Sequence, residues 1–116
     1  MFLNKFNVGL FAFNASSGAT LTKNKNRWKA ETKQIINLAK MADDCKLDFL
    51  LPVARWSDWG GETSPHKNTF ETLSLASALS QITKKIFLFS TIHANYIHPI
   101  IAAKALTSIS RFSKNR

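Results

Sequence analysis

Cysteine, glycine and acidic residues are all scarce in this chain of 116 residues, which has one Cys, 4 Gly and 7 Asp+Glu. The lone Cys45 excludes an internal disulfide and any zinc site built from several cysteines. It fits a reducing environment, so we expect a cytoplasmic protein. No apolar run approaches the roughly 18 residues that a membrane-spanning helix needs. We therefore expect a globular fold that has no contact with the membrane.

The shortage of carboxylates leaves 16 Lys+Arg unbalanced, with a formal net charge of +9, and no Asp or Glu follows Glu71. One interpretation is a small basic binding module that contacts nucleic acid or an acidic partner. A second is a compositional bias, and a third is that the acidic part of a larger protein lies elsewhere. Surfaces that bind nucleic acid interleave arginine with aromatic residues. Here most basic residues are scattered lysines, so we expect no nucleic-acid partner.

Three short apolar runs have the length of β-strands, at residues 8–13, 48–51 and 86–89. They are apolar on both faces, which is typical of parallel strands that are covered on both sides. Residues 1–17 also resemble a targeting signal. The apolar part of that segment is short and contains Gly9, so we favour a strand there.

Helical patterns alternate with these runs. Apolar residues recur every three or four positions and predict helices over about 27–45, 68–83 and 98–111. Asn68 and Glu71 stand in capping-box spacing, which predicts Asn68 as N-cap of the second helix. Three strand–helix units in succession indicate an α/β fold, either an open doubly wound sheet or a (β/α)8 barrel.

Two features favour the barrel. The segment after the first strand, Asn14-Ala-Ser-Ser-Gly18, lacks the GxGxxG pattern of a dinucleotide-binding sheet. The longest connections, 14–26, 53–67 and 90–97, all follow strands, where barrel enzymes build their active sites. Three units cannot close an eight-stranded barrel. We therefore expect residues 1–116 to be either the first three βα units of an incomplete (β/α)8 TIM barrel or a very small open α/β domain.

Several motifs together carry a family resemblance. They are the segment Phe49–Thr63, with its Arg-x-x-x-x-Gly-Gly-Glu-Thr loop, the block Ser90-Thr-Ile-His93 and the helix start His98-Pro-Ile-Ile-Ala-Ala-Lys104. The chain from about residue 8 to its end resembles the bacterial luciferase-like, flavin-dependent monooxygenases. Within that family it resembles the branch of the pyrimidine, dimethylsulfone and alkanesulfonate monooxygenases. Lys46 and the pair Lys114-Asn115 replace family glycines at two turns. A left-handed backbone costs Lys about 1 kcal/mol or more, whereas Asn tolerates it, so the resemblance leaves the geometry of these two turns open.

The resemblance implies a function. The whole protein would take reduced FMN (FMNH2) from a separate flavin reductase and activate O2 through a peroxyflavin, thereby oxygenating a small organic substrate. Full-length members are expected to form homo-oligomers. Residues 1–116 would be the N-terminal part of such an enzyme and inactive alone. The three His and one Cys show no metal-ligand spacing, so no metal is expected.

The resemblance also assigns residues at the ends of the strands. Arg55 is expected to stabilise negative charge on the flavin, although a solvated loop cation is the alternative from sequence alone. Trp56 could wall the site or anchor the long loop by burial, and His66 is expected to be an exposed loop residue. The expected cofactor contacts are Ala54, Arg55, Ser90 and Thr91, and the substrate-pocket candidates are Asn14, Trp56 and His93.

Overall fold

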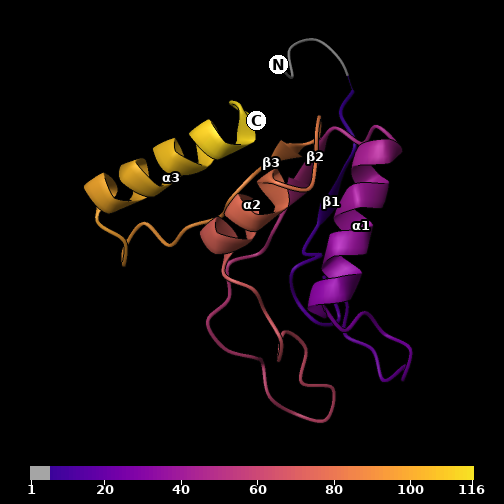
Figure 1. Cartoon of the computed structure of the whole chain (residues 1–116). Helices are drawn as coiled ribbons and strands as arrows, with labels where there is room; N and C mark the ends of the chain where they lie inside the picture. The colour runs from indigo at the N-terminus through magenta and orange to yellow at the C-terminus, as the bar shows by residue number, and fades with distance from the viewer. Residues whose placement is uncertain (1–5) are drawn as a thin grey trace.

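The computed structural model describes residues 6–116 as three strands that alternate with three helices (Figure 1). The strands form one sheet in the order β1-β2-β3, and both pairs are parallel. This confirms the α/β class and the succession of βα units. Within the described part of the chain, no helix is long and apolar enough to cross a membrane. The elements are β1 (Gly9–Phe11), α1 (Thr32–Asp44), β2 (Phe49–Leu51), α2 (Thr72–Ser80), β3 (Phe87–Leu88) and α3 (Pro99–Ser113).

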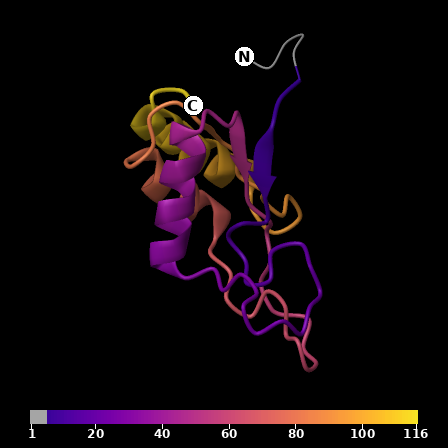
Figure 2. The same cartoon turned by 90° about the vertical axis from the view of Figure 1, so that its right-hand side faces the viewer.

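The two faces of the sheet differ in what covers them. Leu10 and Leu50 stand in register and pack into the hydrophobic core with α1 and α2. Figure 2 shows α1 on one side of β1 and β2. The opposite face is also apolar, and there Phe49 and Phe89 make an edge-to-face contact with ring centroids 5.5 Å apart. Phe11 is 57% exposed. An apolar second face is what the interior of a barrel requires.

Helix α1 buries the face that the periodicity predicts, with Ile35, Ala39 and Ala42 in the core. It begins at Thr32, later than the expected start near residue 27, because Trp28 belongs to the preceding loop. The indole N–H of Trp28 donates to the carbonyl oxygen of Phe13 at 2.7 Å. That bond holds the loop against the end of β1.

The N-cap prediction for α2 is wrong. Glu71, not Asn68, caps the helix, because its carboxylate accepts the backbone N–H groups of Leu73 (2.8 Å) and Ser74 (2.7 Å). Asn68 is used elsewhere: its carbonyl accepts from the backbone N–H of Ser16 at 2.8 Å, and its own N–H donates to the Ser16 hydroxyl at 3.2 Å. A contact between two loops thus takes the place of the expected capping box.

The two turns that lack the family glycines adopt left-handed backbone, with φ of 61° at Lys46, 58° at Lys114 and 64° at Asn115. After α1, the N–H of Leu47 donates to the carbonyl of Ala42 at 3.0 Å, as in a Schellman motif. A non-glycine residue there costs about 1–2 kcal/mol. The capping hydrogen bonds offset that cost.

Candidate functional site

A cleft of about 440 Å³ lies between the segments that follow β2 and β3, beside the N-terminus of α2. Its size is within the range of small-molecule sites, roughly 300–1,000 Å³. Its position at the carboxyl ends of parallel strands is where α/β proteins place their ligands. The structure brings five of the expected site residues into the lining: Ala54, Arg55, Trp56, Thr91 and His93.

The other two expected residues, Asn14 and Ser90, do not line this cleft. Asn14 is fully buried. Its side-chain N–H2 donates to the carbonyls of Val53 and Phe70, both at 2.9 Å, and its Oδ1 accepts the N–H of Val53 at 2.8 Å. The Ser90 hydroxyl donates to the carbonyl of Thr72 at 3.3 Å. Both side chains hold backbone beside the cleft.

Two threonines connect the walls of the cleft. The Thr72 hydroxyl donates to the carbonyl of Thr91 at 2.6 Å, and the Thr91 hydroxyl donates to the carbonyl of Pro52 at 2.8 Å. The first bond joins the start of α2 to the segment after β3, and the second joins that segment to the end of β2. The relative position of the walls is therefore set by two part-buried hydrogen bonds.

An aromatic cluster forms one side of the site. The ring of His93 lies 6.2 Å from the rings of both Trp56 and Tyr96, tilted by 36° and 72°. The Nε2 atom of His93 is buried and has no hydrogen-bond partner among the described residues. Trp56 is 74% exposed, so it does not anchor its loop by burial. These rings also line an adjoining hollow of about 380 Å³.

Arg55 and Glu71 are the charged residues of the cleft. The Arg55 guanidinium carbon lies 4.0 Å from the centroid of the Trp59 ring, so this cation contacts an aromatic face. Burial raises the pKa of Glu71, but the N–H groups of Leu73 and Ser74 outweigh that effect and hold the pKa below its ordinary value. The Glu71 charge is thus committed to the N-terminus of α2. Arg55 supplies positive charge that a ligand can use.

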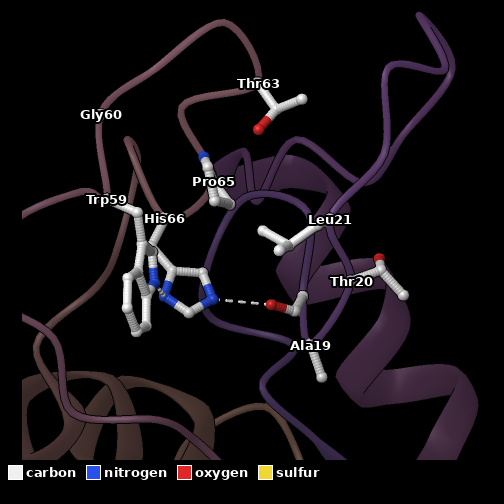
Figure 3. Close-up of a pocket in the computed structure, with 9 residues that line it drawn as sticks. Ala19, Thr20, Leu21, Trp59, Gly60, Thr63, Pro65 and His66 are labelled. Atoms are coloured by element: carbon white, nitrogen blue, oxygen red, sulfur yellow. Dashed lines mark hydrogen bonds between the residues drawn. The ribbon is translucent and has the colours of Figure 1, made fainter.

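A second pocket of about 380 Å³ lies between the loops after β1 and β2 and includes Trp59 and His66 (Figure 3). His66 is only partly exposed, contrary to expectation. Its Nε2 lies 2.7 Å from the carbonyl oxygen of Gly18, and the indole N–H of Trp59 donates to its Nδ1 at 3.3 Å. Sequence patterns gave no signal for this arrangement, because it joins loops that are 48 residues apart.

The chain is similar in sequence to known monooxygenases. A family described as luciferase-like monooxygenase matches residues 6–116. The chain is 27% identical over 110 residues to the pyrimidine monooxygenase RutA of Variovorax paradoxus, covering 95% of this chain and 30% of that protein. It is 26% identical over 109 residues to the same-named protein of Pseudomonas savastanoi, covering 94% and 30%. The chain thus spans about 30% of the length of these relatives.

Proposed function

The chain belongs to the luciferase-like monooxygenase family, and from that membership we propose that it contributes the first three βα units of a barrel enzyme that oxygenates a small organic substrate with FMNH2 and O2. The observation that carries the proposal is the cleft where Ala54, Arg55 and Thr91 meet at the carboxyl ends of β2 and β3. A separate flavin reductase in the cytoplasm is the partner that this chemistry requires. A homo-oligomeric whole protein is part of the same proposal.

The residues of the cleft fit a flavin ring. Arg55 offers a cation to the negative charge of the reduced ring, and its guanidinium carbon lies 4.0 Å from the centroid of the Trp59 ring. Ala54 and Thr91 bring backbone from the two strand ends to the same cleft. Ser90 fixes the segment before Thr91 through its bond to α2. When bound, the reduced flavin supplies the activation of O2, and the protein positions it and keeps water away.

The aromatic cluster supports a planar substrate. Trp56 and Tyr96 flank His93, whose Nε2 lacks a partner among the described residues. A flat heterocycle could stack on such rings and exchange a hydrogen bond with an imidazole nitrogen after a small movement of the ring. The relatives are named as pyrimidine monooxygenases. We therefore propose that the substrate is a small nitrogen heterocycle.

Because the chain spans about 30% of its relatives, we propose that residues 1–116 alone bind FMN weakly and do not turn over. Weak binding can be followed by NMR, with oxidised FMN as a stable probe titrated into the labelled chain. We expect the largest shifts at Ala54, Arg55 and Thr91, with a dissociation constant above about 1 µM.

The variants Arg55→Ala and Arg111→Ala test the role assigned to the cation, since Arg111 is exposed on α3 outside the cleft. One charge-assisted contact is worth about 1.5 kcal/mol, or roughly tenfold in affinity. We expect that loss for Arg55→Ala and no change for Arg111→Ala. Equal effects of the two variants, or shifts concentrated away from the cleft, would refute the proposed site. A sub-micromolar constant for the isolated chain would refute the proposal of weak binding.

A further inference from the structure

His66 joins the loop after β1 to the loop after β2 through both its backbone and its ring. Its backbone N–H donates to the carbonyl of Ser16 at 2.9 Å, and Ser16 is 9% exposed. Its ring lies between the carbonyl of Gly18 and the indole N–H of Trp59. Figure 3 shows the His66 ring beside the Trp59 indole. The imidazole is therefore fixed to a buried part of the fold, whereas Trp59 is 64% exposed and has little packing of its own.

The partners of the ring determine its tautomer. The carbonyl oxygen of Gly18 can only accept, so Nε2 of His66 must carry a hydrogen. The indole N–H of Trp59 can only donate, so Nδ1 must present a lone pair. The neutral Nε2–H tautomer alone satisfies both contacts. The Nδ1–H tautomer and the protonated ring both lose the bond to Trp59.

The orientation of Trp59 matters because Arg55 rests on its ring. The guanidinium carbon lies 4.0 Å from the ring centroid, well inside the distance of about 6 Å for a cation–π contact. Arg55 is exposed, so without this platform its long side chain would sample many rotamers. His66 itself does not line the cleft that contains Arg55. The His66 ring contacts the cleft through Trp59. The backbone carbonyl of His66 also accepts the hydroxyl of Thr69, which lines the cleft, at 2.8 Å, and this contact does not depend on the tautomer of the ring.

We propose that His66 is a positioning residue: as the Nε2–H tautomer it holds the Trp59 indole against the Arg55 guanidinium and so fixes the cation at the edge of the cleft. Only the role of the Arg55 cation in flavin binding rests on the proposed function. The positioning of Arg55 by His66 and Trp59 does not. The chain of contacts from Gly18 through His66 and Trp59 to Arg55 exists without a flavin. Its test can therefore be separated from flavin binding.

The test is NMR of the isotope-labelled full chain without any ligand. Long-range proton–nitrogen spectra of the imidazole should show Nε2 protonated and Nδ1 unprotonated at His66. The indole N–H signal of Trp59 should have the shift of a hydrogen-bonded donor. The side-chain methylene signals of Arg55 should be displaced upfield by the indole ring current. An Nδ1–H tautomer at His66 would overturn the proposal.

Two substitutions separate positioning from general structure. His66→Asn keeps an acceptor near the Nδ1 position, and Asn tolerates the left-handed backbone found there, with φ of 65°. His66→Gln keeps a donor near the Nε2 position and loses the acceptor. We expect the Trp59 and Arg55 signals to persist in His66→Asn and to be lost in His66→Gln. His98→Gln is the matched control, since His98 caps α3 away from both pockets, and it should change neither signal.

Trp59→Phe provides a route that leaves His66 and its strained backbone untouched. It removes the indole N–H that His66 accepts and should weaken FMN binding three- to tenfold, with no further loss when combined with His66→Gln. Unchanged Arg55 signals in both His66→Gln and Trp59→Phe would overturn the proposal. If the ligand-free signals are as expected but FMN leaves Arg55 unshifted, the positioning role stands and the proposed flavin role of Arg55 fails.

Discussion

Asn14→Ala is the substitution that most directly tests how the fold builds the site. The side chain of Asn14 is fully buried and holds Val53, which immediately precedes Ala54 and Arg55. It also holds the carbonyl of Phe70, which precedes the N-cap of α2 and lies 56 residues away in sequence. Removing the amide should therefore destabilise the protein and release the cleft from β1 at the same time.

The expected loss in the free energy of unfolding follows from the three hydrogen bonds of the Asn14 amide. A neutral hydrogen bond contributes about 1 kcal/mol net, but a buried partner left unsatisfied costs about 1–3 kcal/mol. The substitution leaves the N–H and carbonyl of Val53 and the carbonyl of Phe70 without their hydrogen bonds to Asn14. Because the surrounding chain can relax in part, we expect a loss of about 3–5 kcal/mol in the free energy of unfolding. That is a large share of the roughly 5–15 kcal/mol available to a domain of this size.

Asn14→Asp separates the hydrogen bonds from the cavity, because it keeps the volume but replaces the donor by a carboxylate that faces two carbonyls. It should be at least as destabilising at neutral pH, and it should recover in part on acidification, when the protonated carboxyl regains one O–H donor. Urea unfolding followed by circular dichroism measures both variants. Asn26→Ala, at an exposed loop position, is the control and should stay within about 0.5 kcal/mol. An Asn14→Ala value within about 1 kcal/mol of the control would refute the reasoning.

Three further predictions concern the same framework. Asp43→Asn should lower the free energy of unfolding in urea by about 2–3 kcal/mol, because the carboxylate accepts three backbone N–H groups before β3. The control Asp44→Asn should lower it by less than about 0.5 kcal/mol. Burial raises the pKa of Asp43, yet those bonds hold it below 3.8. Its stabilisation is therefore complete above that pH and lost as pH falls through the folded-state pKa, a dependence that an acid titration of Asp43→Asn should lack. Glu71→Gln should lower stability by about 1 kcal/mol above pH 4.5 and converge with the parent in acid, since the folded-state pKa of Glu71 is also lowered. Gly9→Ala should lower the thermal midpoint, at a cost of about 1–3 kcal/mol, because the added methyl overlaps the ring and carbonyl oxygen of Phe49; an unchanged midpoint would contradict that packing.

The order of elements was accessible from sequence because it depends on local periodicity. The apolar stripe with Ile35 and Ala39 at its centre predicts which face of α1 is buried, and the structure confirms it. Where local preference competes with distant contacts, the prediction fails. Asn is a preferred N-cap residue and Glu is not. Asn68 nevertheless bonds to Ser16, 52 residues away, and Glu71 caps α2. That decision is tertiary, so no local pattern records it.

In the candidate site, too, one part could be predicted from the sequence and another could not. Parallel strands end at one edge of a sheet, so the placement of Arg55 and Thr91 in one cleft follows from topology. The direction of each side chain does not. Asn14 turns into the fold to hold Val53, and the His66 ring reaches from the loop after β2 to the carbonyl of Gly18 in the loop after β1. Both roles depend on contacts between segments that are distant in sequence, which composition and spacing cannot show.

The charge of +9 comes from 16 Lys+Arg against 7 Asp+Glu, and the structure shows how some of these few carboxylates are used. Glu62 pairs with Lys23 at 2.6 Å on the surface. Asp43 and Glu71 both accept backbone N–H groups, so their charges stabilise segment ends instead of pairing with surface lysines. A surface for a polyanion would interleave many cations with aromatic rings. Among the described residues such a cation–aromatic pair forms between Arg55 and Trp59, at the edge of the cleft. One cation held on an aromatic face suits a single anionic ring better than an extended polyanion, and this favours the proposed flavin over the alternative of a basic binding module.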